Sequence, residues 1–159
     1  MRALCLIPPA TFSKNLPVSA SFRLPPNTYE VHLALIVAPA MAESPRFRGS
    51  GEIRFRNGIG NFADSEMSGG GSIGEPGAEP GGIAGESPSV LPDECAMIDF
   101  EQRDSPLWGV SVPAGAEFVR VTIIPEAGNN GGAIWCGAVV IAYDESGNPL
   151  EIDPSTRGS

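Results

Sequence analysis

The residues that could do acid–base chemistry are few and far apart. His32 is the only histidine, and it lies inside an apolar run, where a histidine more often packs in a core or at a sheet edge than acts as a general base. Asp99 and Glu101 share one face of an expected strand, about 7 Å apart. This spacing could imitate a glycosidase carboxylate pair, but exposed carboxylates of this kind are usually solvated. Because no G-x-S-x-G elbow supplies an activated serine either, we expect no enzyme activity.

Metal and cofactor sites are not expected. Cys5, Cys95 and Cys136 are far apart, and each lies in an apolar run, which is typical of buried, reduced thiols. A disulfide between two of them is the alternative. The acidic residues between positions 93 and 104 lack the ligand spacing of an EF-hand. The glycines at 69–71 are not followed by the Lys-Ser/Thr of a phosphate-binding loop.

A cluster of arginines between positions 46 and 56 is the clearest candidate binding surface in the sequence. Residues 51–57 alternate between apolar and charged side chains, so they predict a strand with Arg54 and Arg56 on its outward face. Arg46 and Arg48 come just before it. The cluster is either an edge strand guarded by charge or a docking face for an acidic neighbour. We therefore name Arg46, Arg48, Arg54 and Arg56 as candidate interface residues.

A long acidic segment rich in glycine and proline, at about 58–92, is the second candidate contact element. It contains the near repeat Glu75-Pro76-Gly77 and Glu79-Pro80-Gly81. Because the segment has almost nothing to bury, we expect no regular structure in it and expect it to order against an adjacent subunit. Its candidate interface residues are Glu75, Pro76, Glu79 and Pro80.

Two tryptophans could stack on sugar rings. Trp135 lies in an apolar run and is expected in the core, whereas Trp108 follows Pro106-Leu107 and precedes Gly109. Trp108 is therefore the candidate for glycan stacking, and packing in the core is the alternative for both.

The charge distribution bears on the kind of partner. The net charge of −9 argues against nucleic acid, which needs a basic face. Residues 1–56 carry a net charge of +4 and the remainder −13, so the chain could bind copies of itself or a complementary neighbour. The alternative is that both charged sets are simply solvated faces.

The longest apolar run, 133–143, is too short to span a bilayer. The N-terminus has no signal-like apolar stretch, which predicts folding in a cytoplasm without a membrane partner.

Turn residues positioned between short apolar runs predict the fold. We expect one all-β domain over 1–159, an antiparallel β-sandwich, jelly-roll-like, with the long loop at about 58–92. The first strand should end at Pro8-Pro9, and Asn129-Asn130-Gly131-Gly132 predicts a hairpin between the last two long strands. The expected strands are 2–7, 17–24, 29–38, 51–57, 93–101, 108–112, 117–124, 133–143 and 150–152.

The segment 112–141 is similar to the closing hairpin of galactose-binding-like jelly rolls, a superfamily that includes many carbohydrate-binding modules. The resemblance implies a jelly-roll fold and a glycan ligand. The family commonly has an aspartate after the tryptophan, associated with a structural calcium, where this chain has Cys136 and Gly137. The matching residues are Pro113, Ala114, Gly115, Ala116, Val119, Arg120, Val121, Trp135, Val139 and Ile141.

The sequence as a whole resembles the small accessory proteins of phage-like virions. We expect a non-enzymatic virion structural protein, either a capsid decoration or cement protein or a tail-associated subunit, assembled in the host cytoplasm. Its partner would be a capsid protein, another virion protein or copies of itself. The alternative function is a carbohydrate-binding module or virion adhesin that uses Trp108.

Overall fold

The computed structural model describes residues 2–37, 48–58, 71–73, 94–100, 108–127 and 133–158, which form two antiparallel β-sheets. The elements are β1 (Arg2–Ser13), β2 (Val18–Arg23), β3 (Glu30–Val37), β4 (Arg48–Arg56), β5 (Gly71–Ile73), β6 (Ala96–Asp99), β7 (Trp108–Ser111), β8 (Phe118–Ala127), β9 (Ala133–Tyr143), β10 (Pro149–Leu150) and the 3₁₀ turn η2 (Pro154–Thr156). Among these residues no helix is long and apolar enough to cross a membrane.

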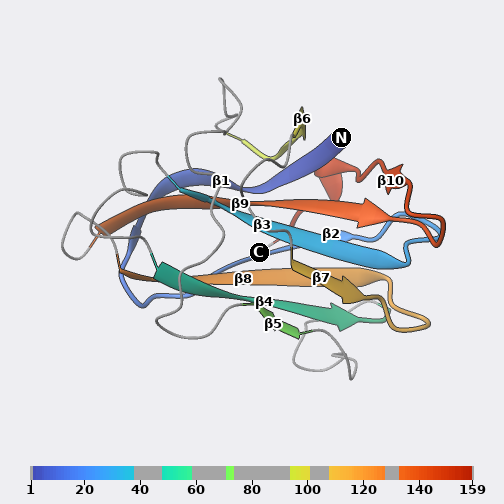
Figure 1. Ribbon diagram of the computed structural model, residues 1–159, viewed down its shortest axis with the longest axis horizontal. Helices are drawn as coiled ribbons and strands as arrows, with labels where there is room; N and C mark the ends of the chain where they lie inside the picture. Colours follow the sequence, from blue (N-terminus) through green and yellow to red (C-terminus); the bar gives the residue numbers. More distant parts are fainter. Residues whose placement is uncertain are drawn as a thin grey trace.

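The strand order is that of a jelly roll. One sheet has the order β6-β1-β9-β3-β7, with β10 beside β9, and the other has the order β2-β8-β4-β5. Figure 1 shows β1, β9 and β3 in one layer and β8, β4 and β5 in the other. The first four strands alternate between the two sheets, and β1 lies beside β9, as in a double-sheet jelly roll. The predicted all-β sandwich is confirmed.

The predicted hairpin between β8 and β9 is wrong, because the two strands belong to different sheets. β8 pairs with β2 and β4, whereas β9 pairs with β1 and β3. The burial patterns explain this separation. β8 is half-buried, with Val119, Val121 and Ile123 inward, and residues 136–142 of β9 are buried on both faces. A strand apolar on both faces belongs at the centre of the larger sheet.

The main core lies between the sheets. Phe22 and Phe55 from the four-stranded sheet, and Leu33 and Val140 from the six-stranded sheet, are completely buried there. Because Ile53 and Phe55 of β4 are both buried here, the predicted alternation of that strand is confirmed. A second cluster lies on the outer side of the six-stranded sheet, formed by Ala3, Cys5, Ala34, Phe100, Val139 and Ile141.

β1 does not end at Pro8-Pro9, as the sequence analysis predicted, but continues to Ser13. Its register with β9 shifts on both sides of Ile7. Proline is tolerated in a strand at such a bulge, because the missing N–H falls where the ladder is already interrupted. Gly137 lies against this bulge, and a Cβ atom at Gly137 would be only 2.6 Å from the carbonyl oxygen of Ile7.

Regular structure also occurs inside the segment 58–92, where none was expected. β5 pairs with residues 51–53 of β4, so β4 is not an edge strand along that stretch. Two strands of a sheet need only backbone groups to pair, which is why a segment with little to bury can still add a strand. Residues 59–70 and 74–92 lie outside the described part of the chain.

The C-terminal tail covers the outer edge of β2. Ser21 and Gly158 exchange two backbone hydrogen bonds of 2.8 Å. The backbone N–H of Arg23 donates to Thr156 Oγ1 at 3.0 Å, and Arg157 Nε donates to the carbonyl oxygen of Leu6 at 2.8 Å. The tail therefore joins the two sheets and satisfies backbone groups that an edge strand would otherwise present to solvent.

Candidate functional site

The outward side of the four-stranded sheet gathers four arginines around one phenylalanine. The register of β8 with its neighbours places Arg23, Phe118 and Arg56 in one cross-strand row. The next row contains Arg120 and Arg54. We call this surface the arginine face and define it as Arg23, Arg54, Arg56, Arg120 and Phe118. It forms because residues alternate between the two sides of a strand, so the buried neighbours of these residues direct them outward.

Phe118 lies between two guanidinium groups. The Cζ atom of Arg56 is 4.0 Å from the ring centroid and that of Arg23 is 5.4 Å away, both within the range of a cation–π interaction. Arg56 Nη1 also donates to the carbonyl oxygen of Gly58 at 2.7 Å. The planar groups at the centre of the arginine face are thus positioned by stacking and by a hydrogen bond.

The arginine face is basic although the chain is acidic. Arg54 Nε lies 3.0 Å from Glu52 Oε1, and Arg23 Nη2 lies 3.7 Å from Glu117 Oε2. Ion pairs as exposed as these contribute little to stability. Among the described residues of this surface there are four arginines and two glutamates, in a chain whose net charge is −9.

The structure brings together only some of the residues that the sequence analysis named as candidates for an interface or for glycan stacking. Arg54 and Arg56 share the arginine face. Arg48 is described by its backbone in β4, and Trp108 by its backbone at the start of β7. The glycan-stacking role of Trp108 therefore stays a prediction. The other nominated residues lie outside the described part of the chain: Arg46, Glu75, Pro76, Glu79 and Pro80.

Sequence reasoning missed two members of the arginine face, Arg23 and Arg120. A signal for both was present, because alternation in 18–24 and 117–124 placed each of them on the polar side of its strand. What the sequence lacked was the pairing of β2 and β4 with β8, which brings those polar sides together.

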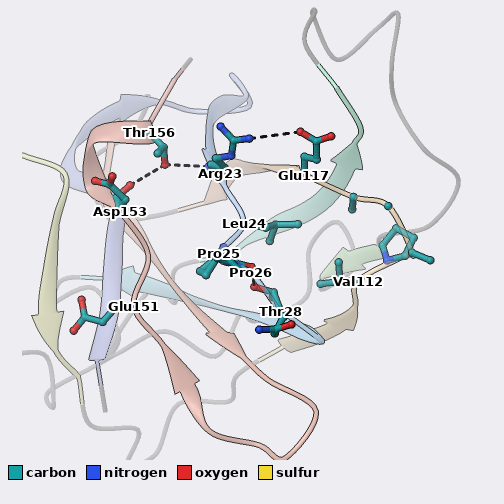
Figure 2. A pocket seen from close by; sticks show the side chains of 15 residues that line it. Arg23, Leu24, Pro25, Pro26, Thr28, Val112, Glu117, Glu151, Asp153 and Thr156 are labelled. Atoms are coloured by element: carbon teal, nitrogen blue, oxygen red, sulfur yellow. Dashed lines mark hydrogen bonds and ion pairs between the residues drawn. The ribbon is translucent and has the colours of Figure 1, made fainter.

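A pocket of about 560 Å³ adjoins the arginine face at the end of the sandwich. Figure 2 shows the Arg23–Glu117 ion pair at this pocket, with Pro25, Pro26 and Thr28 farther along the lining. Two of its threonines are hydrogen-bonded to the backbone of the residues around it. Thr156 Oγ1 accepts from the Arg23 N–H and donates to the Asp153 carbonyl, and Thr28 Oγ1 donates to the Pro25 carbonyl at 2.6 Å. These contacts indicate that the loops are held in place by the residues lining the pocket.

His32 lies on the other sheet, on its outer side. Its Nε2 atom is 2.9 Å from Glu30 Oε2, and its ring packs edge-on against Tyr143 with a centroid distance of 4.7 Å. The side chain is 24% exposed, so His32 is partly buried and has a hydrogen-bond partner. The carboxylate of Asp99 is 91% exposed and lies 3.5 Å from Arg2, which agrees with a solvated residue.

The cysteines are free thiols, and none of them forms a disulfide. Burial raises the pKa of Cys5 to about 11 and that of Cys136 to about 12. Burial also raises the pKa of Cys95, against the opposing effect of Arg157. Among the described residues no group of three or more His, Cys, Asp and Glu side chains is placed to hold a metal ion.

Comparison of the chain with protein-family models, curated proteins and solved structures finds no match. The candidate site is therefore defined by its own geometry: a cluster of arginines centred on Phe118, on the outward side of the four-stranded sheet.

Proposed function

We propose that this chain is a non-enzymatic structural subunit that works by assembly, docking an acidic surface of a neighbouring protein onto the arginine face. The observation that supports this is the stacking of Arg23 and Arg56 on Phe118, beside Arg54 and Arg120. Guanidinium groups bind carboxylates in a planar, bidentate geometry. Stacking also fixes the guanidinium groups before a partner arrives, which reduces the entropy lost on binding.

A virion is the proposed setting of this assembly, with the chain acting as a capsid decoration or cement protein or as a tail-associated subunit. Jelly rolls are common among viral capsid domains, although lectins use the same architecture. Fold alone does not determine function, so the arginine face carries the proposal. A net charge of −9 favours a protein partner over nucleic acid.

Reversing the charge of Arg54 and Arg56 together should weaken docking strongly. We expect Arg54→Glu/Arg56→Glu to weaken binding to poly-L-glutamate, used as a simple acidic probe, by about a hundredfold, because close charge pairs at interfaces contribute about 1.4 kcal/mol or more each. Titration of the ¹⁵N-labelled wild-type protein at low salt should shift amide signals of β2, β4 and β8 before those of the other sheet.

The matched control is Arg2→Glu/Lys14→Glu, which changes the net charge equally and leaves the arginine face intact. The control should bind the probe nearly as well as the wild type. Equal weakening by both double variants, or signal shifts spread evenly over both sheets, would show that only net charge matters and would overturn the proposal.

A further inference from the structure

An asparagine–glycine pair comes directly after the last residue of β4. Asn57 is exposed, and Gly58 has a φ of +67°. A Cβ atom added at Gly58 would have nothing within 4 Å. No hydrogen bond within the described part of the chain holds the side-chain amide of Asn57 or the N–H of Gly58. The pair therefore lies beyond the β4 ladder and is open to solvent.

This arrangement allows the asparagine side chain to react with its own backbone. The deprotonated nitrogen of Gly58 attacks Cγ of Asn57, a new C–N bond closes a succinimide ring, and the side-chain nitrogen leaves as ammonia. Water then opens the ring. Opening at the former side-chain carbonyl gives aspartate at position 57, and opening at the main-chain carbonyl gives isoaspartate. One water is consumed, one ammonia is released and nothing is oxidised or reduced. Because the reacting atoms belong to neighbouring residues, the step needs no second molecule besides solvent.

Asn15 and Asn27 are the closest comparisons, because both are exposed and both have a positive φ, of 63° and 68°. The nitrogen that would attack is already engaged in each case. The N–H groups of Leu16 and Thr28 each donate to the carbonyl oxygen three residues before them, at 3.3 Å. Leu16 and Thr28 also carry side chains beside that nitrogen, whereas glycine leaves it unhindered.

Asn148 is held in a different way. Pro149 follows it and has no backbone N–H to lose. Its Nδ2 atom also donates to Asp144 Oδ2 at 3.4 Å. Among the described residues, Asn57 is therefore the one asparagine that combines an unbonded side-chain amide with an unbonded, unhindered N–H at the next residue.

We propose that Asn57 is a site of spontaneous deamidation, and that its conversion weakens docking at the arginine face. The effect on docking rests on the proposed function, since it takes the arginine face to be a docking surface. The reacting bond adjoins a contact of that surface. Arg56 Nη1 donates to the carbonyl oxygen of Gly58 at 2.7 Å, and the same guanidinium group stacks on Phe118.

The products change this contact in two ways. Isoaspartate adds one methylene to the main chain between Arg56 and Gly58, so the carbonyl oxygen that receives the hydrogen bond moves. Either product also places a new carboxylate one residue from Arg56. A carboxylate there competes with those of a partner for the guanidinium group. Both effects reduce the affinity of the arginine face for an acidic surface.

Peptide mapping of the aged protein tests the modification site. The full chain is kept in warm, mildly alkaline buffer, where the attacking nitrogen loses its proton more readily, and is then digested with pepsin in acid. We expect Asn57 to lose its amide at least about fivefold faster than Asn15 or Asn27, because a hydrogen bond must first break at those positions. Electron-based fragmentation in the mass spectrometer separates isoaspartate from aspartate. The sequence contains a second Asn-Gly pair, at 130–131; it lies outside the described residues, and its peptide is followed separately.

Asn57→Gln is the matched control for docking, because attack on the longer side chain must close a larger ring and is much slower. Fresh wild-type protein and fresh Asn57→Gln should bind poly-L-glutamate equally. The deamidated form, isolated by anion exchange, should bind about fivefold more weakly, as expected of one added unit charge a few ångströms away in a solvated site. Asn57→Gln aged in parallel should keep its affinity, and fresh Asn57→Asp should show the loss that the charge alone causes.

Distinct outcomes contradict the two halves of the inference. Equal rates of amide loss at Asn57, Asn15 and Asn27 would overturn the modification site. Rapid loss at Asn57 with an unchanged affinity, or an equal loss of affinity in aged Asn57→Gln, would overturn its effect on docking. Failure of the fresh wild-type protein to bind the probe would instead count against the proposed function, and the peptide map, which requires no partner, would still decide the modification site.

Discussion

Replacing Gly137 with alanine is expected to lower the free energy of unfolding by about 3 kcal/mol, at the upper end of the cost of overpacking a core. A Cβ atom there would lie 2.6 Å from the Ile7 carbonyl oxygen and 2.9 Å from the Pro9 nitrogen. Both are backbone atoms of the bulge in β1, so no side-chain rotation relieves the contact. β1 would have to move away from β9 at the centre of the six-stranded sheet. Urea denaturation followed by tryptophan fluorescence measures the loss.

Gly115→Ala provides the comparison. Gly115 has a φ of +86° and nothing within 4 Å of an added Cβ atom, so alanine there costs only the strain of a left-handed backbone, about 1–2 kcal/mol. If Gly137→Ala were no more destabilising than Gly115→Ala, the close approach of β9 to the bulge would not be a constraint on this fold.

Stability is expected to fall steeply between pH 9 and pH 12, by on the order of 7 kcal/mol. Burial raises the pKa of Cys5 to about 11 and that of Cys136 to about 12, from an ordinary value of 9.0. Below pH 9 both thiols are protonated whether the chain is folded or unfolded, and the stability is fully present. Above pH 9 the unfolded chain loses these protons while the folded chain keeps them. Each thiol then favours unfolding by about 1.4 kcal/mol for every pH unit above 9, until the pH reaches its pKa in the folded chain.

Urea titrations at pH 8, 9, 10 and 10.5 measure this loss, and Cys136→Ala is the variant that isolates its cause. Removal of the sulfur leaves a small cavity, so the variant should be less stable at pH 8. Its stability should nevertheless decline less between pH 9 and 10.5, because one buried thiol no longer titrates. Parallel declines in the variant and the wild type would contradict the account.

Much of the fold is encoded in local alternation. Phe22, Phe55 and Val121 are apolar residues between polar neighbours, and all three are buried. Residues 136–142 of the long apolar run that became β9 are buried on both faces. What local patterns could not supply was the choice of sheet for each strand. The Asn-Gly sequence at 129–132 predicts a hairpin, yet β9 joins the six-stranded sheet because its second apolar face would otherwise be exposed.

The candidate site was only partly predictable for a related reason. Arg54 and Arg56 are visible in the sequence because they lie two residues apart on one strand. Arg120 becomes their neighbour only through the pairing of β4 with β8. Glu30 and His32 become neighbours of Tyr143 through the pairing of β3 with β9. Hydrogen bonds between backbones carry no residue-specific signal, so such neighbours cannot be deduced from one sequence.

β1 is made early and acquires its partners late. It pairs with β9 and β6, so the backbone of Leu4 lacks its partner Val140 until β9 has been synthesised. At ordinary translation rates of about 5–20 residues per second, the intervening residues 14–132 take on the order of ten seconds to synthesise. During that interval an apolar strand with open edges is available to other chains. Overproduction of this protein should therefore favour aggregation, and a lower level of expression, with fewer nascent chains present at once, should increase the soluble fraction.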